Sequence, residues 1–79
     1  MSTHKLSNIP LGLYRKFLQS QGCKVIRTSG GHEHWSRTDL PRTLTLQTHI
    51  SPVPERIIRQ HLAYLKIDRE KFSEIMQGL

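Results

Sequence analysis

The first apolar pattern along the chain is a helical stripe between Leu13 and Leu18, where apolar residues recur at intervals of three and four. This spacing places them on one face of an α-helix. Pro10 suits the first turn of that helix, because the first amide groups of a helix have no partner within it. Gly22 suits its end, where a left-handed residue commonly stops a helix. The pattern therefore predicts a first helix over residues 10–21.

After Gly22 the period of the pattern shortens to two. Three segments have the character of strands, residues 23–28, 32–37 and 42–48, and turn residues separate them. A Ser-Gly-Gly connection at 29–31 is typical of a tight hairpin, and a turn that contains proline precedes the last strand. Three strands joined by short turns predict an antiparallel meander with one apolar and one polar face.

Two amphipathic helices are predicted to complete the chain, over residues 56–65 and 69–76, because apolar residues again recur at intervals of three and four. Asp68 is a favourable N-cap for the second of them. The simplest packing places the helices on one face of the sheet. The sequence thus predicts one α+β domain over residues 1–79, with residues 1–8 as a flexible leader.

Successive residues of the second strand point to opposite faces of the sheet. The segment therefore divides into two sets, with His32, His34 and Ser36 on one face and Glu33, Trp35 and Arg37 on the other. We expect Trp35 to pack on the core, although base stacking is an alternative role for an indole. In that register both imidazoles point outward, beside Thr43, Thr45 and Gln47 of the third strand. A slip of one residue would reverse the faces.

Charge narrows the classes of partner. The 79 residues carry twelve Lys and Arg against six Asp and Glu, for a net charge of +6. The excess is uneven, because residues 1–53 hold seven of the bases and two of the acids. A basic surface on so small a domain favours an anionic partner, most often nucleic acid, whereas the simpler interpretation is a protein that is merely basic.

Other bulk features bear on the compartment. No run of about 20 apolar residues is present, so no membrane span is expected. The polar N-terminus has no apolar core of a signal peptide. Cys23 is the single cysteine and has no partner for an internal disulfide, and we expect it to be a buried structural thiol. These features favour a reducing cytoplasm.

The two outward histidines are candidates for acid–base catalysis at neutral pH. Histidine both takes and gives protons near neutral pH, and RNA carries its own nucleophile in the 2′-hydroxyl group. RNA cleavage therefore needs a base, an acid and cations for the phosphate, and in principle no metal. The candidate set is His32 with the cations Lys24, Arg27 and Arg37, and the backbone amides of Gly30 and Gly31 as further anion donors. The plainer interpretation of a His-x-His pair on an exposed strand is polar surface.

Two other interpretations of these residues remain open. A zinc site would combine His32 and His34 with His49, His61 or Cys23, but neither a Cys-x-x-Cys nor a His-Glu-x-x-His pattern is present. We therefore predict no metal and no cofactor. The helical pair Arg56 and Arg59 either contacts phosphates or forms a solvated face.

The order of these motifs resembles the HicA family of toxins from bacterial type II toxin–antitoxin systems. That family has a Gly-Ser-His-x-x-aromatic stretch at the start of its second strand, and Gly-Gly-His-Glu-His-Trp occupies residues 30–35 here. Its third strand ends in a Pro-x-His-like segment, and Leu-Gln-Thr-His occupies residues 46–49. The upstream helix that ends in glycine before a short strand matches residues 21–25, and the two following helices match as well. The likeness covers residues 8–77.

The resemblance implies a double-stranded-RNA-binding-domain-like fold, α-β-β-β-α, with an extra C-terminal helix. It implies cleavage of mRNA without the ribosome, growth inhibition, and a HicB-type antitoxin partner that covers the active face. The family's catalytic histidine corresponds to His32, and its second histidine corresponds to His49, in a role of support or substrate contact. Together with the residue-level argument this gives a predicted RNA-binding set of Lys24, Arg27, Gly30, Gly31, His34, Arg37 and His49.

Two departures from the family pattern accompany the resemblance. Gly31 stands where the family usually has serine, and Gln47 stands where proline is common. The first removes a hydroxyl group beside His32, and the second loosens the connection before His49. Two alternatives to the toxin follow: a non-catalytic RNA-binding module of the same fold, and a protein-interaction domain whose basic face meets an acidic partner.

Overall fold

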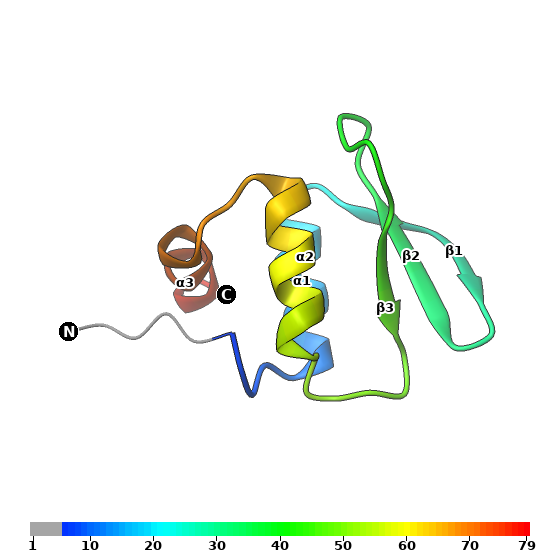
Figure 1. Ribbon diagram of the computed structural model, residues 1–79, viewed down its shortest axis with the longest axis horizontal. Coiled ribbons are helices and arrows are strands. Elements are labelled where there is room, and N and C mark those ends of the chain that lie inside the picture. The colour runs from blue at the N-terminus through cyan, green and yellow to red at the C-terminus, as the bar shows by residue number, and fades with distance from the viewer. Residues whose placement is uncertain (1–5) are drawn as a thin grey trace.

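Within residues 6–79, which are the residues that the structure describes, three helices and three strands are joined by short connections. The computed structural model has them in the order α1 (Leu11–Ser20), β1 (Lys24–Ser29), β2 (His32–Ser36), β3 (Leu44–Gln47), α2 (Glu55–Leu65) and α3 (Arg69–Gln77) (Figure 1). The predicted α+β order is confirmed, and each boundary differs from its predicted position by two residues or fewer.

The three strands form an antiparallel sheet in the order β1-β2-β3, so β2 lies at its centre. Ser29 pairs with His32 across a two-residue turn. The φ angles in that turn are 55° at Gly30 and 83° at Gly31. Positive φ at both central positions matches the twist of the flanking strands, and glycine adopts it without the strain that a Cβ atom would bring. The predicted Ser-Gly-Gly hairpin is therefore confirmed.

A β-bulge in β1 changes which of its side chains share a face. Lys24 pairs with Ser36 on β2. Arg27 pairs with His34, so three steps along β1 match two steps along β2, and Ile26 is the extra residue. A bulge resets the alternation of faces on its own strand. Both cations of β1 consequently share the sheet face of His34.

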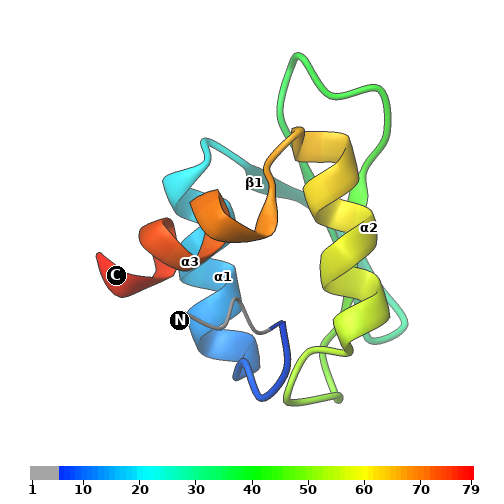
Figure 2. The same ribbon diagram turned by 60° about the vertical axis from the view of Figure 1, so that its left-hand side comes forward.

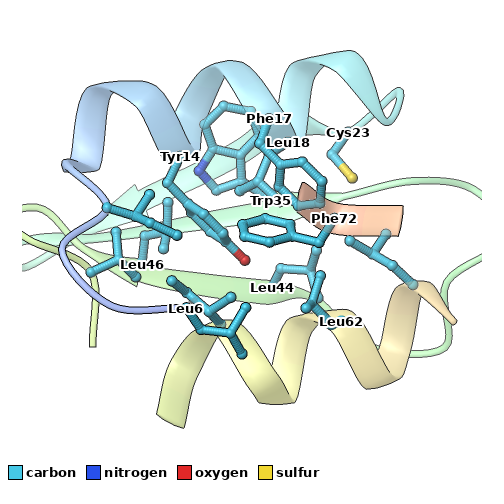
Figure 3. Close-up of a cluster of buried hydrophobic side chains, with 14 of the residues drawn as sticks. Leu6, Tyr14, Phe17, Leu18, Cys23, Trp35, Leu44, Leu46, Leu62 and Phe72 are labelled. Carbon is cyan, nitrogen blue, oxygen red and sulfur yellow. The ribbon is translucent and has the colours of Figure 1, made fainter. Parts of the chain in front are cut away.

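The helices cover one face of the sheet. Figure 1 shows α1 and α2 between the sheet and α3, and Figure 2 shows α1 and α2 side by side. The core between these layers contains side chains from every helix and strand except β1, whose residues are all exposed. Among the core residues are Leu6, Tyr14, Phe17, Leu18, Cys23, Trp35, Leu44, Leu46, Leu62 and Phe72 (Figure 3). The rings of Phe17 and Phe72 pack edge to face, with their centroids 4.7 Å apart. This T-shaped geometry is favourable for an aromatic pair, and the contact joins α3 to α1.

The predicted flexible leader is wrong at Leu6. The side chain of Leu6 is 2% exposed and belongs to the core, and Ile9 is buried beside it. The backbone of Ile9 also accepts a hydrogen bond from Val53 at 2.9 Å. An isolated leucine in a polar segment has no periodicity that predicts burial, so this packing depends on the tertiary fold. The rest of the predicted leader includes residues 1–5, which lie outside the described residues.

The helices are short and amphipathic. The longest, α2, has 11 residues, and no helix within residues 6–79 is long and apolar enough to cross a membrane. Asp68 caps α3, because its carboxylate accepts a hydrogen bond from the backbone amide of Lys71 at 2.7 Å. The predicted N-cap is thus confirmed.

Candidate functional site

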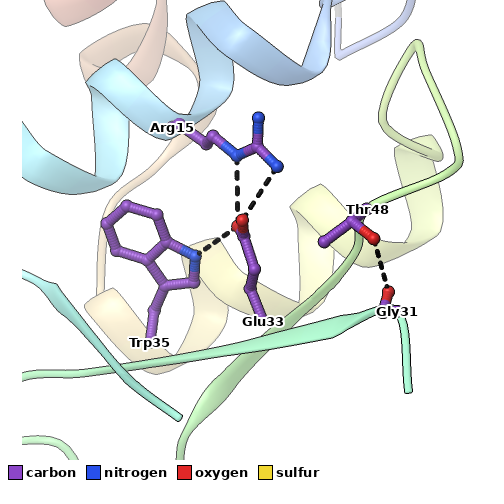
Figure 4. A network of polar contacts seen from close by, with 5 residues as sticks. All are labelled: Arg15, Gly31, Glu33, Trp35 and Thr48. Atoms are coloured by element: carbon purple, nitrogen blue, oxygen red, sulfur yellow. Dashed lines mark hydrogen bonds and ion pairs between the residues drawn. The ribbon is translucent and has the colours of Figure 1, made fainter. Parts of the chain in front are cut away.

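The two faces of β2 have different roles. Trp35 is 3% exposed and packs in the core, and its indole Nε1–H donates to Glu33 at 3.1 Å. Arg15 of α1 donates two hydrogen bonds to the same carboxylate, at 3.1 and 2.8 Å (Figure 4). The side chains of Glu33 and Trp35 therefore lie on the face of β2 that packs against α1, as the predicted register requires. The imidazoles of His32 and His34 lie on the opposite, open face.

Cross-strand partners define the surroundings of the two imidazoles. His32 lies between Ser29 of β1 and Gln47 of β3. His34 lies between Arg27 and Thr45, and the Thr45 hydroxyl is 3.3 Å from His34 Nδ1. Directly opposed residues of antiparallel strands point to the same face. The open face therefore consists of Lys24, Arg27, Ser29, His32, His34, Ser36, Thr45 and Gln47.

The open face carries basic and neutral groups. Glu33 is the only acidic residue within the three strands, and its carboxylate is turned toward α1. Lys24 and Arg27 are exposed, and the bulge at Ile26 brings them to this face. A phosphate that approaches His32 on this side meets cations and no carboxylate from the strands. Of the predicted cations, the structure thus brings two to the face of His32.

Arg37, the third predicted cation, is held elsewhere. Its guanidinium makes two hydrogen bonds with Asp39, at 2.6 and 3.1 Å, and a third with the carbonyl of Gln21 at 2.7 Å. The hydrogen bonds from Arg37 hold the pKa of the Asp39 carboxyl below its ordinary value. These contacts join the turn after β2 to the end of α1, so Arg37 has a structural role here and is not grouped with His32.

His49 lies against the hairpin turn. The carbonyl of Gly31 accepts hydrogen bonds from the backbone amide of Thr48 at 2.8 Å and from its hydroxyl at 3.0 Å (Figure 4). A Cβ atom added to Gly31 would lie 2.9 Å from Nε2 of His49. The imidazole therefore occupies the space that a side chain at Gly31 would take. The structure brings His49 to the residue that precedes His32, and the same glycine marks the departure from the family serine.

A pocket opens beside His32, between β3 and α2. It encloses about 210 Å³ and has a mixed lining of polar and apolar groups. Its polar lining includes His32, Gln47, Arg56 and Gln60. Gln60 had no signal in the sequence as a functional residue, because a glutamine on a helix is ordinary surface. The prediction that Arg56 contacts phosphate stays open, with its side chain now located at the pocket.

His61 is a core residue, which the helical stripe of α2 would have revealed. It is 1% exposed and lies three residues after Ile58, on the stripe that continues to Leu65. The hydroxyl of Tyr14 is 2.7 Å from its Nδ1 atom, and burial lowers the pKa of His61 to about 4. The structure thus places His61 in the core, whereas His32 lies on the open face of the sheet. No group of three or more His, Cys, Asp or Glu side chains suited to a metal occurs among residues 6–79.

The open face thus combines an imidazole with two cations, and a pocket adjoins it. An imidazole and cations are among the groups that metal-independent cleavage of a phosphodiester requires. Comparison of the chain with protein-family models, with curated proteins and with solved structures found no match. A functional assignment therefore depends on the chemistry of these residues and on the resemblance between the order of the motifs and that of the HicA family.

Proposed function

We propose that this protein is a metal-independent endoribonuclease of the HicA kind, the toxin of a type II toxin–antitoxin system that cleaves mRNA without the ribosome. One observation carries the proposal. His32 lies on the open sheet face with Lys24 and Arg27, while the acidic residue of the same strand is turned to the helices. The resemblance to the toxin family adds the expectation of a cytoplasmic enzyme with a HicB-type antitoxin as partner.

In this proposal His32 takes the proton of a 2′-hydroxyl group. The freed oxygen attacks the adjacent phosphorus, and the bond between phosphorus and the 5′-oxygen breaks. The leaving oxygen takes a proton from an acid, for which His49 is the candidate because its ring lies against Gly31. Arg27, which pairs with the position two residues from His32, offsets the charge that develops on the phosphate. Lys24, which pairs with Ser36 further along the same face, contacts another phosphate of the RNA chain. The products are a 2′,3′-cyclic phosphate and a 5′-hydroxyl end.

The test uses three proteins, the wild type, His32→Ala and Ser36→Ala, each incubated with a long mRNA in the presence of a chelator. Ser36 is the matched control, because it lies on the same strand and face four residues further on and is outside the predicted RNA-binding set. We expect fragments with cyclic phosphate ends from the wild type and the control, and loss of cleavage of at least a hundredfold from His32→Ala. Cleavage by His32→Ala at the wild-type rate would exclude His32 as the catalytic group.

A second candidate, a non-catalytic RNA-binding module, draws on the same basic face. It predicts RNA binding that weakens steeply with salt and yields no fragments. It also predicts that Arg27→Ala weakens binding while His32→Ala does not. A neighbouring protein that suppresses cleavage would favour the toxin, whereas a tight complex without any affinity for RNA would favour an interaction domain.

A further inference from the structure

The pocket beside His32 has walls that the fold holds in place. Leu11, at the start of α1, lines it, and its backbone amide donates to the hydroxyl of Ser51 at 3.1 Å. Val53 lines it as well, and its amide donates to the carbonyl of Ile9 at 2.9 Å. Ile57 of α2 adds a third apolar wall. These long-range hydrogen bonds tie the connection after β3 to α1, so the pocket exists before any ligand binds.

The polar groups of the pocket come from β3 and from α2, the elements on either side of it. Gln47 lines it and is the direct cross-strand partner of His32. Arg56 and Gln60 are four residues apart on α2 and therefore lie on the same side of that helix. The amide of Gln60 makes one long hydrogen bond, 3.4 Å, to the hydroxyl of Tyr64. None of the ion pairs among residues 6–79 involves Arg56, so its guanidinium is available to an anion.

We propose that this pocket is a subsite for one nucleobase of single-stranded RNA, next to the phosphate on which His32 acts. The role of His32 rests on the proposed function, whereas base binding by the pocket does not. A base is flat, with faces that pack on apolar side chains and edges that donate and accept hydrogen bonds. Specific recognition of RNA commonly uses bases splayed out of the stack in this way.

The lining fits a nucleotide better than an apolar side chain from a partner protein. A leucine or phenylalanine would fill the space near Val53 and Ile57 but would leave Gln47, Gln60 and Arg56 without partners. Side-chain amides both donate and accept, as the edges of the bases do. Arg56 supplies the positive charge that a phosphate on either side of the base requires. The occupant is therefore an anion with an aromatic, polar-edged body.

This assignment gives the enzyme a cleavage preference. If one base enters the pocket, the phosphate beside it is presented to His32, and other phosphodiesters are not. Gln47 and Gln60 then select among bases, since bidentate hydrogen bonding by an amide discriminates by about tenfold or more. Cuts should accordingly cluster at one base type at a fixed distance from the scissile bond.

Binding is tested without cleavage by adding mononucleotides to the full-length protein labelled with ¹⁵N. The probes are AMP, GMP, CMP and UMP, with ribose 5-phosphate as the control that lacks a base and N-acetyltryptophanamide as an apolar aromatic that lacks phosphate. We expect at least one nucleotide to shift the signals of Gln47, Ile57 and Gln60, by more than either control does. Equal shifts from ribose 5-phosphate would overturn the proposal, as would shifts at these residues from N-acetyltryptophanamide alone, which would indicate a protein partner.

Specificity is tested by sequencing the ends of the fragments made by variants. Gln60→Ala removes one amide, Ile57→Trp fills the pocket, and Gln19→Ala on α1 is the matched control away from the site. We expect Gln60→Ala to relax the base preference about tenfold and Ile57→Trp to lower cleavage, with the map of Gln19→Ala unchanged. If both pocket variants cut the RNA at the same positions as the wild type, the base subsite would be excluded, and the proposed nuclease activity would not be affected. Nucleotide binding at the pocket without any cleavage of RNA would support the base subsite and exclude the proposed endoribonuclease activity.

Discussion

Two histidines of this chain lie in opposite environments. His61 is 1% exposed in the core, and its ring is hydrogen-bonded to Tyr14 at 2.7 Å. His32 lies half-buried on the open face of the sheet, between Ser29 and Gln47 and beside the pocket. The same side chain is a packing group in one place and an accessible imidazole in the other. The accessibility of a histidine in the fold, and not its residue type, therefore decides whether it belongs to the candidate site.

The core histidine is tolerated because its Nδ1 atom has a hydrogen-bond partner and its ring stays neutral. Burial raises the pKa of Tyr14, so its hydroxyl keeps its proton and donates to Nδ1 of His61. Burial lowers the pKa of His61, and the backbone of Thr45 raises it by a smaller amount. The fold therefore favours the neutral imidazole, which accepts a hydrogen bond from the Tyr14 hydroxyl.

The largest expected effect compares His61→Ala with His32→Ala in urea unfolding. We expect His61→Ala to lower the free energy of unfolding by at least about 3 kcal/mol, because it leaves a cavity and an unpaired Tyr14 hydroxyl. His32→Ala should change it by less than about 0.5 kcal/mol. Equal losses in the two variants would contradict the contrast. The double variant Tyr14→Phe with His61→Leu removes both polar partners and should recover most of the loss.

The pH dependence of the free energy of unfolding also distinguishes His61 from His32. The pKa of His61 is about 4 in the folded protein against 6.5 for the ordinary group, so the unfolded chain binds a proton first as the pH falls. Stability is therefore lost as the pH falls through 6.5 toward 4, by about 2 kcal/mol between pH 7 and pH 5. The urea midpoint at the two pH values measures this loss. It should persist in His32→Ala and shrink in the Tyr14→Phe, His61→Leu double variant, and a persistent loss in the latter would point to another group.

A smaller effect concerns the backbone on the site side. Gly30→Ala and Gly31→Ala both force a Cβ atom onto a residue with positive φ, at a cost of about 1 kcal/mol each. The two differ in surroundings, because the new Cβ meets open space at Gly30 and the ring of His49 at Gly31. Since that ring is exposed, we expect it to rotate away, so only Gly31→Ala should shift the imidazole NMR signals of His49. Unshifted signals in Gly31→Ala would place His49 away from the turn.

The smallest effect concerns the polar contacts that hold β2 against α1. Glu33→Gln keeps an acceptor for Trp35 but loses the charge that pairs with Arg15. Because the Arg15 side chain is 35% exposed, solvent screens the pair, and we expect a loss of about 0.5 kcal/mol. Asp39→Asn, on a more exposed pair, is the control and should lose less in thermal unfolding. A loss larger than that of the glycine variants would show that this contact supports the whole sheet.

Local patterns predicted most of the fold. Helical stripes, the alternation along β2 and the glycine pair at the turn depend on neighbours within a few residues, so they can be read without tertiary contacts. Trp35 on one face and His32 on the other followed from that alternation and are confirmed by the contacts of Glu33. The burial of Cys23 was also predicted correctly.

Features that depend on distant segments were predicted wrongly or not at all. Leu6 was expected in a flexible leader but packs in the core, because the helices leave an apolar gap that only the tertiary fold creates. Arg37 makes contacts with Asp39 and the end of α1 that the sequence did not predict. The nucleic-acid role of Lys24, Arg27, Gly30, Gly31, His34, Arg37 and His49 stays a prediction, as does catalysis by His32.

Backbone geometry and short-range periodicity fix the α+β order, the hairpin turn, the N-cap of α3 and the face on which each residue of β2 lies. These features can therefore be predicted from the sequence alone. The partners of Arg37, the burial of Leu6 and the position of the pocket beside His32 follow only from the tertiary structure. The physical reason is that burial and pocket shape arise from contacts between segments far apart in the chain. For the same reason, Gln60 of α2 and Gln47 of β3 line one pocket that neither segment predicts alone.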